Sequence, residues 1–308
     1  MTGTFIILIN YNNHNDTLKC LTSIKEAGYS NNVVVVDNNS TVEGIDEIRE
    51  KFPSTILLKN DMNIGFGRAN NVGIDWVTNN TVCEFIFILN NDTTINKDTI
   101  NYLERMMKKN KNIGIVSPKI AMMDLPDRLW YGGGCINWKK GSATIPGYLA
   151  DSNSELACIT RKVEFASGCA MLVRRSVIEC IGGFDRRFFM YEEDLEFCCR
   201  AREHGWEIWY VSDALVLHKC QGSLRKKSEL FNSIWSPKNP NLPFYMYQIT
   251  KNRMQSMHLH AKGKNRFYFF TIFPCILILK SIQFLYFRRF DGIKAIYLGI
   301  KDFLYDIT

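Results

Sequence analysis

The sequence predicts an α/β fold built on a mostly parallel central sheet. Short apolar runs, rich in β-branched side chains, alternate with helical patterns through the first third of the chain. Such alternation is typical of βαβ units, in which successive strands lie parallel and helices cover both faces of the sheet. The 308 residues are 46% hydrophobic and 13% aromatic, which allows a large core and excludes a disordered protein.

Strands and helices are expected to alternate in this first part. The strands are the apolar runs at residues 5–9, 33–36, 56–58 and 85–89, and the helices are the segments at residues 17–26, 43–51, 69–77 and 98–109. The last of these helices ends on Lys108 and Lys109, whose positive charges complement the negative end of a helix dipole.

The second part of the pattern is less regular. Residues 114–148 show no clear period, and the glycines of YGGG within them predict a flexible hinge or loop. Residues 163–173 resume as one strand, interrupted at SGCA. A helix is expected from near Glu192, with acidic residues in its first turn, to Gly205 as its stop. The segments WEIWYV and ALVLH then add further strands.

Two of the predicted strands end in polar residues. The strand at 85–89 is followed by NND, which a polar turn would explain. The C-terminal edge of a parallel sheet is, however, also the usual ligand site of open α/β folds. The second strand ends on Asp37, which either caps a turn or accepts a hydrogen bond from the N3–H group of a pyrimidine base. The glycines of NIGFGRANNVG, residues 63–73, precede a helix whose N-terminus can face a diphosphate.

Six segments together resemble glycosyltransferase family 2, in its bacterial rhamnosyltransferase-like branch. They are ILINYNN…LKCLTSI, VVVVDNNST, NDMNIGFGRANNVG, FILNNDT, SGCAMLVRRSVIECIGGFDRRFFMYEEDLEFCCRAREHG and VLHKCQGS, in the family's order over residues 4–223. One such motif is weak evidence, whereas six in register are specific. The resemblance implies a GT-A fold, the Rossmann-like fold of nucleotide-diphospho-sugar transferases.

The resemblance places the nucleotide and a divalent metal at the strand ends. Asp37 is expected to bind the base. The other expected nucleotide ligands are Asn10, Asn38, Asn63, Gly65, Phe66, Asn70 and Asn91. Asp92 stands at the last position of the family's D-x-D motif and is expected to bind Mg²⁺ or Mn²⁺ together with His218. These cations prefer hard oxygen ligands and leave other sites to phosphates and water. Without the resemblance, His218 would be read as an ordinary surface or core histidine rather than as a metal ligand.

The acidic segment FMYEEDLEF resembles the family's E-D motif, whose aspartate is the general base. This assigns the base to Asp194, with Glu193 as the substitute, although acidic first turns are also favoured by the helix dipole. Nearby acids are expected to raise the pKa of the base. The expected lining of the donor and acceptor pocket consists of Gly168, Asp185 and Trp130.

The implied reaction is a metal-assisted single displacement that inverts the sugar. The donor is dTDP-L-rhamnose or a UDP-hexose, and the acceptor is a hydroxyl group of a polysaccharide or of a polyprenyl-diphosphate-linked glycan. A noncatalytic sugar-nucleotide-binding protein would keep Asp37 but has no need of Asp194. A nucleic-acid-binding protein would use only basic residues, so we expect no nucleic-acid partner. A homo-oligomer stays open.

Charge separates an acidic catalytic region from a basic C-terminal region. Residues 1–218 carry 23 Lys and Arg against 27 Asp and Glu, whereas residues 219–308 carry 15 against 4. A basic region of this kind favours an anionic partner, such as a membrane surface or a nucleic acid. The expected division is a catalytic domain at 1–223, with a nucleotide-binding half at 1–115 and an acceptor half at 116–223, followed by a helical, basic and aromatic extension at 224–308.

The apolar segment at residues 267–287 is expected to lie in a membrane interface. Its unbroken apolar part before Lys280 has 13 residues, shorter than the roughly 20 that a spanning helix needs, and both flanks are basic. The alternatives for this segment are a helix packed on the catalytic domain and a helix that spans the membrane once. The short start FIILI is not expected to be a secretory signal, and the ten cysteines are expected to be reduced. We therefore expect a cytoplasmic protein, peripheral on the cytoplasmic face of the cell membrane.

Overall fold

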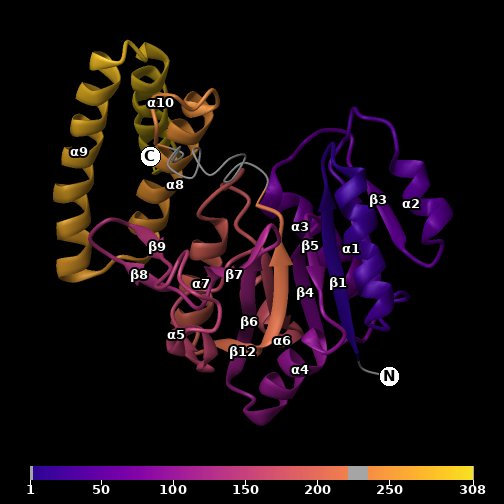
Figure 1. The fold of residues 1–308 in the computed structure, drawn as a ribbon. Coiled ribbons are helices and arrows are strands. Elements are labelled where there is room, and N and C mark those ends of the chain that lie inside the picture. Colours follow the sequence, from indigo (N-terminus) through magenta and orange to yellow (C-terminus); the bar gives the residue numbers. More distant parts are fainter. Residues whose placement is uncertain (1–2, 221–234, 308) are drawn as a thin grey trace.

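A computed structural model describes residues 3–220 and 235–307 (Figure 1). Within these residues the chain forms one ten-stranded mixed sheet, flanked by helices, with three further helices at the C-terminal end. The order of the strands in the sheet is β10 (Arg161–Val163), β12 (Glu207–His218), β6 (Ile113–Met122), β11 (Ala170–Arg174), β4 (Phe85–Asn90), β1 (Thr4–Asn10), β2 (Val33–Asp37) and β3 (Ile56–Lys59). In addition, β5 (Thr93–Ile95) pairs with β12, and β7 (Leu125–Tyr131) pairs with β6. A separate hairpin consists of β8 (Cys135–Asn137) and β9 (Ser142–Thr144).

The first half of the sheet follows the predicted alternation. The strands are β1 (Thr4–Asn10), β2 (Val33–Asp37), β3 (Ile56–Lys59) and β4 (Phe85–Asn90), and the helices are α1 (His14–Glu26), α2 (Ile45–Lys51), α3 (Phe66–Asn80) and α4 (Thr99–Lys109). Strands β3, β2, β1 and β4 run parallel. Consecutive residues of β1, Ile6, Ile7 and Leu8, are all fully buried, so both faces of the sheet are covered.

One antiparallel strand interrupts the parallel order. β11 (Ala170–Arg174) lies between β4 and β6 (Ile113–Met122) and runs antiparallel to both. β6 in turn pairs in parallel with β12 (Glu207–His218). The fold is therefore α/β with a mostly parallel mixed sheet, as the sequence predicts. The two strands expected from WEIWYV and ALVLH are one strand, β12.

The prediction of irregular structure after Gly114 was wrong at its start. β6 is a central strand that pairs in parallel with β12. β7 (Leu125–Tyr131) follows it and pairs antiparallel with β6. The polar middle of β6, including Pro118, breaks the apolar run that marks a buried strand. A proline removes a ladder hydrogen bond, and Pro118 lies where the register of β12 shifts between Val211 and Leu215. This bulge accommodates the proline inside the sheet.

The single strand predicted at residues 163–173 was also wrong. The chain forms β10 (Arg161–Val163) at the edge of the sheet and β11 near its centre. The separating residues include Ser167, Gly168 and Cys169, whose backbone serves the candidate site described below. The expected boundary at 115/116 falls inside β6. The expected boundary at 223/224 lies outside the described residues.

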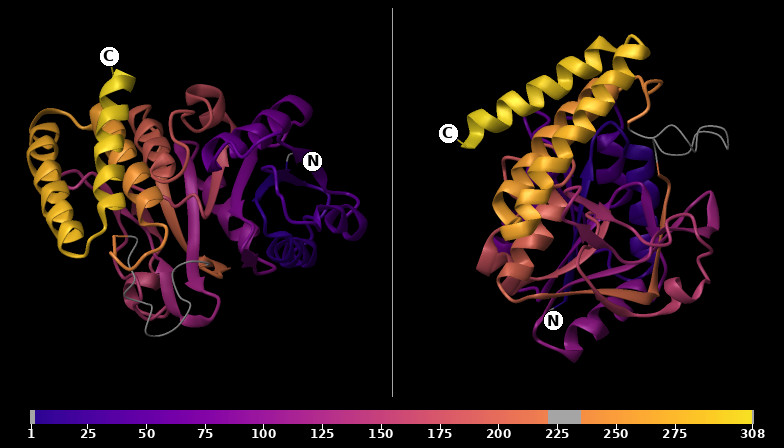
Figure 2. Two further views of the ribbon diagram at one scale, coloured as in Figure 1. Left: turned by 90° about the horizontal axis from the view of Figure 1, so that it is seen from above. Right: turned by 90° about the vertical axis from the view of Figure 1, so that its left-hand side faces the viewer.

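The C-terminal extension is helical. Its helices are α8 (Leu242–His260), α9 (Gly263–Tyr286) and α10 (Phe290–Ile307), and they stand together at one side of the sheet (Figures 1 and 2). α8 contacts α7 (Glu193–Glu203), the helix that precedes β12, and α10 lies along α8. Two short helices complete the fold among the described residues. α5 (Glu155–Cys158) precedes β10 in the chain, and α6 (Arg175–Ile181) follows β11.

α9 continues past Lys280 and is longer than its apolar core suggested. In the part of the chain that the structure describes, it is the one helix that is long and apolar enough to cross a membrane by length and composition. All ten cysteines are free thiols, as expected for reduced side chains.

Candidate active site

Polar side chains from three neighbouring strands lie at one edge of the sheet. β1 lies between β2 and β4, and its register pairs Ile9 with Asn90 and Asn10 with Asp37. The three strands therefore end at the same level. Their polar ends share the edge at which open α/β sheets bind ligands.

Asp37 is held at this edge by a network of hydrogen bonds. Asn10 Nδ2 donates to Asp37 Oδ1 over 3.0 Å, and Ser40 Oγ donates to the same oxygen over 2.5 Å. Thr17 Oγ1 donates to Asn10 Oδ1 over 2.8 Å and accepts from Asn91 Nδ2, also over 2.8 Å. The network joins Asp37, which is 1% exposed, to the polar end of β4.

Asn38 attaches the glycine-containing segment to the same edge. Its Nδ2 donates to Asn63 Oδ1 over 2.8 Å, and its Oδ1 accepts from Ile64 N over 3.1 Å. Asn63 Oδ1 also accepts from Gly65 N over 3.0 Å. These bonds fix the turn that leads into α3.

Gly65 lies where two distant segments touch. Its φ is +86°, and a Cβ atom at this position would overlap the carbonyl oxygen of Phe189. The next residue, Phe66, donates its N–H to that oxygen over 2.9 Å. Only glycine fits this contact, which brings the start of α3 against the segment that precedes α7.

Asp92 and His218 face one another at the end of the sheet. His218 Nε2 is 3.2 Å from Asp92 Oδ1. β12 ends on His218, which pairs with Thr93 of β5 (Thr93–Ile95), and Lys219 N donates to Asp92 O over 2.9 Å. The Trp130 ring packs edge-on against the imidazole, with centroids 4.7 Å apart. Trp130 thus contacts the expected metal ligand directly.

The donors present fit a hard divalent cation. Asp92 offers a carboxylate oxygen and His218 an imidazole nitrogen, a set compatible with Mg²⁺ or Mn²⁺. Across residues 3–220 and 235–307, no group of three or more His, Cys, Asp and Glu side chains could hold a metal ion. Asn90 Oδ1, at the same strand end, is buried without a hydrogen-bond partner among the described residues. A cation bound here would complete its shell with phosphate oxygens and water.

Asp194 reaches the same strand end from α7. Its Oδ2 accepts from Gly168 N over 2.9 Å, and its Oδ1 accepts from Leu195 N over 2.9 Å. The adjacent residue, Cys169, accepts from Asn90 N over 2.8 Å through its carbonyl oxygen. Two consecutive backbone groups therefore join the expected base to the end of β4.

Burial dominates the electrostatics of the two acids. It raises the pKa of Asp194 to about 6, against the opposing hydrogen bond from Gly168. Burial, reinforced by the charge of Asp194, raises the pKa of Glu193 well above its usual range, and Glu193 Oε2 has no hydrogen-bond partner among the described residues. Burial also raises the pKa of the Cys169 thiol, with contributions from Asp92 and Asp194. Asp92 and Asp194 therefore both lie near the Cys169 thiol.

Comparison with known proteins decides the family of this chain. Residues 5–182, more than half of the sequence, match the family described as Glycosyl transferase family 2. The chain belongs to glycosyl transferase family 2.

Two curated relatives and one solved structure illustrate the similarity. The low-salt glycan biosynthesis hexosyltransferase Agl10 of Haloferax volcanii is 30% identical over 221 residues, which cover 69% of this chain and 66% of the relative. An N-acetylglucosaminyl-diphospho-decaprenol L-rhamnosyltransferase of Mycobacterium tuberculosis is 28% identical over 210 residues, 60% of this chain and 66% of the relative. The chain thus spans just under two thirds of either relative. The crystal structure of GalNAc-T7 with UDP, GalNAc and Mn²⁺ has a TM-score of 0.60 at 15% identity, over 100% of this chain and 57% of that one. This likeness shows a GT-A-like fold.

The backbone before the family 2 E-D motif is strained. Tyr191 and Glu192 both adopt left-handed conformations, with φ of +69° and +67°. Such residues cost about 1–2 kcal/mol each. α8 stabilises them: Asn252 Nδ2 donates to two successive carbonyl oxygens of the turn, over 2.9 and 2.8 Å, and Arg253 Nε donates to Glu192 Oε1 over 2.7 Å. The sequence analysis missed Asn252 and Arg253, because no local signal marks a residue whose partner is about 60 positions away.

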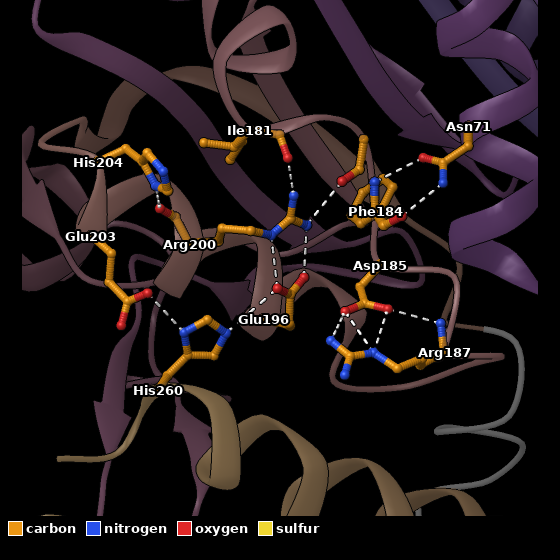
Figure 3. A network of polar contacts seen from close by, with 11 residues as sticks. Asn71, Ile181, Phe184, Asp185, Arg187, Glu196, Arg200, Glu203, His204 and His260 are labelled. Atoms are coloured by element: carbon orange, nitrogen blue, oxygen red, sulfur yellow. Dashed lines mark hydrogen bonds and ion pairs between the residues drawn. The ribbon is translucent and has the colours of Figure 1, made fainter. Parts of the chain in front are cut away.

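A second polar network anchors the rest of α7 (Figure 3). Arg200 binds both oxygens of Glu196 over 2.8 Å. His260, at the end of α8, lies 3.4 Å from Glu196 and 3.1 Å from Glu203. Burial favours a higher pKa for Glu196, but the contact with His260 and the hydrogen bonds from Arg200 outweigh it and lower that pKa. These contacts connect α8 to the helix that carries Asp194.

Of the remaining residues predicted to line the pocket, Gly168 lies next to Asp194, whereas Asp185 is paired within its own loop. A Cβ atom at Gly168 would lie 3.2 Å from Phe66 Cε1 and 3.4 Å from Asp194 Cβ, so these three residues are neighbours. Asp185 instead forms an ion pair with Arg187 of its own loop (Figure 3). Its place in a donor or acceptor pocket stays a prediction. Asn70 Nδ2 donates to a carbonyl of its own helix, and its Oδ1 is buried with no partner among the described residues.

Replacing Gly65 by alanine tests the contact with Phe189. We expect Gly65→Ala to lower the free energy of unfolding by more than the roughly 1–3 kcal/mol that this backbone conformation (φ +86°, ψ 171°) costs a non-glycine residue, because the new Cβ atom would also overlap Phe189 O. Gly182→Ala is the matched control, since Gly182 has nearly the same backbone conformation (φ +76°, ψ −175°) and nothing within 4 Å of a Cβ atom. Urea denaturation measures both values, and equal losses would contradict the proposed close contact.

Removing the α8 contacts tests whether they position Asp194. We expect Arg253→Ala and Asn252→Ala to lower kcat by about tenfold, equivalent to about 1.4 kcal/mol in the barrier, with little change in donor KM. Lys251→Ala is the control, because Lys251 pairs with Asp306 of α10 over 2.9 Å on the same helix. Steady-state kinetics with the proposed donors provide the measurement. An equal loss in the Lys251 variant would show that α8 acts only on stability.

Proposed function

We propose that this protein transfers a sugar from a nucleotide diphosphate donor to a hydroxyl group, with inversion at the anomeric carbon. The observation that carries the proposal is the convergence of Asp92, His218 and Asp194 on one strand end, through Gly168 and Cys169. A diphosphate site and a proton acceptor are the two groups that a single displacement needs.

Each residue has a defined part in the proposed reaction. Asp194 accepts the proton of the acceptor hydroxyl, whose oxygen forms a bond to the anomeric carbon. The bond from that carbon to the diphosphate oxygen breaks, and the nucleoside diphosphate leaves with the electron pair. Asp92 and His218 would hold Mg²⁺ or Mn²⁺, which when bound neutralises charge on the diphosphate. The Gly168 N–H orients Asp194 for the transfer.

The proposed donor is dTDP-L-rhamnose or a UDP-hexose. Asp37 Oδ1 is occupied by Asn10 and Ser40, whereas its Oδ2 accepts one long hydrogen bond of 3.3 Å, from Ser40 N. Oδ2 can therefore accept from the N3–H group that uracil and thymine carry. The rhamnosyltransferase and hexosyltransferase names of the relatives agree with this choice.

The proposed acceptor is a polysaccharide or a polyprenyl-diphosphate-linked glycan. The mycobacterial relative is named for a lipid-diphosphate acceptor. A noncatalytic sugar-nucleotide-binding protein remains the alternative from another class. It has no use for a buried carboxyl group whose pKa is raised toward neutrality, so the state of Asp194 favours the enzyme.

Replacing Asp194 separates catalysis from binding. We expect Asp194→Asn to lower transfer from dTDP-L-rhamnose or UDP-glucose by about a hundredfold to ten-thousandfold, since a general base contributes about 10²–10⁴. Nucleotide affinity with Mn²⁺, measured by calorimetry, should stay near that of the unaltered protein. Asp75→Asn, the same change on an exposed position of α3, is the control. Near-normal transfer by the Asp194 variant would refute the assignment of the base.

The raised pKa of Asp194 predicts an acid limb in the pH profile. Above pH 6 the carboxylate is ionised and accepts the proton, so kcat/KM is expected to be constant there. Below pH 6 it is protonated, and kcat/KM should fall about tenfold per pH unit. An ordinary aspartate would retain activity to about pH 4. Kinetics between pH 4.5 and 8 test this, and a profile that is flat to pH 5 would contradict it.

A further inference from the structure

α9 carries two apolar stripes on opposite sides. Phe269, Phe273, Leu277 and Phe284 are buried against the other helices. A second stripe recurs at helical spacing on the exposed side, and its largest members are Ile278, Ile282 and Leu285, which are 59%, 59% and 57% exposed. Soluble surface helices normally place polar residues on that side. Packing among the described residues therefore does not explain the exposed stripe.

An apolar groove opens beside this stripe. Its volume is about 500 Å³, and it lies between α9 and α10 with Met254 of α8 at its side. Ile278, Ile282 and Leu285 line the groove as well as forming the exposed stripe. The groove and the stripe are thus one continuous apolar surface, of the kind that marks a protein or membrane contact.

The charges around this surface are arranged for an anionic bilayer. Lys280, the one charged residue of segment 267–287, is turned away: it donates to Gln283 over 2.9 Å and lies 5.7 Å from the centre of the Trp235 ring. Exposed basic residues flank the stripe at both ends, with Lys264 and Arg266 before it and Arg288 after it. Cationic ends with an apolar, aromatic face are typical of helices that lie in a membrane interface.

We propose that α9 and α10 form a docking surface for an anionic lipid bilayer, with α9 lying along the interface. The buried stripe packs on α8 and α10, so lipid can cover only one side of α9. Basic residues at both ends leave no charge asymmetry to orient a span, and with lipid on only one side of α9 this favours a helix that lies in the interface over one that spans the membrane. The aromatic residues Phe267, Tyr268, Tyr286 and Phe287 are exposed at the two ends, where interfacial rings are favoured. This inference does not depend on the proposed catalytic activity.

Vesicle flotation of the full chain tests the docking surface. We expect the protein to float with vesicles of phosphatidylcholine and phosphatidylglycerol, to bind vesicles of phosphatidylcholine alone far less, and to be released in part by salt. Ile278→Ser/Ile282→Ser should weaken binding by about tenfold or more, because it removes apolar surface from the contact. Val42→Ser/Val82→Ser, on exposed positions of the catalytic region, should bind normally. Thermal melts of both variants check that they fold.

Three outcomes would overturn the proposal. The first is failure of the unaltered chain to bind the anionic vesicles. The second is a dimer in analytical ultracentrifugation that Ile278→Ser/Ile282→Ser abolishes, since a second copy would then cover the surface. The third is resistance of membrane-bound protein to extraction at alkaline pH, which would show a spanning helix.

Discussion

The backbone at Gly168 and Cys169 holds the candidate site together. Gly168 donates to Asp194, and Cys169 accepts from Asn90, so two adjacent peptide groups join α7 to the end of β4. This junction exists because β11 enters the sheet antiparallel between β4 and β6 and presents its first residues at the C-terminal edge of the parallel strands. Without that insertion, the expected base and the expected cation ligands would belong to separate parts of the fold.

The acidic turn shows how the fold maintains a chemically useful but unfavourable arrangement. Tyr191 and Glu192 have left-handed backbone conformations. Burial raises the pKa of Glu193 well above its usual range and the pKa of Asp194 to about 6. Each of these features costs free energy of folding. Compensation comes from α8: Asn252 donates two hydrogen bonds to the turn, and Arg253 and His260 form ion pairs with Glu192 and Glu196.

The C-terminal helices present two different surfaces, one packed on the rest of the chain and one exposed. α8 packs on the catalytic region through polar contacts, and α9 turns an uncharged stripe outward beside the groove shared with α10. His260 and Lys262 mark the junction between α8 and α9. A membrane bound to α9 would therefore lie next to α8, the helix that contacts the turn before Asp194.

The sequence by itself determined the local elements and the family. Alternating apolar runs and helical periods specify β1 to β4, and the motifs around Asp37, Asp92 and Asp194 are continuous in the chain, so both can be read without a structure. Tertiary structure alone decided the position of β11, the burial that raises the pKa of Asp194 and the role of Asn252. It also decided β6, where the register of β12 shifts beside Pro118. These features depend on contacts between residues far apart in the chain, and local periodicity carries no information about such contacts.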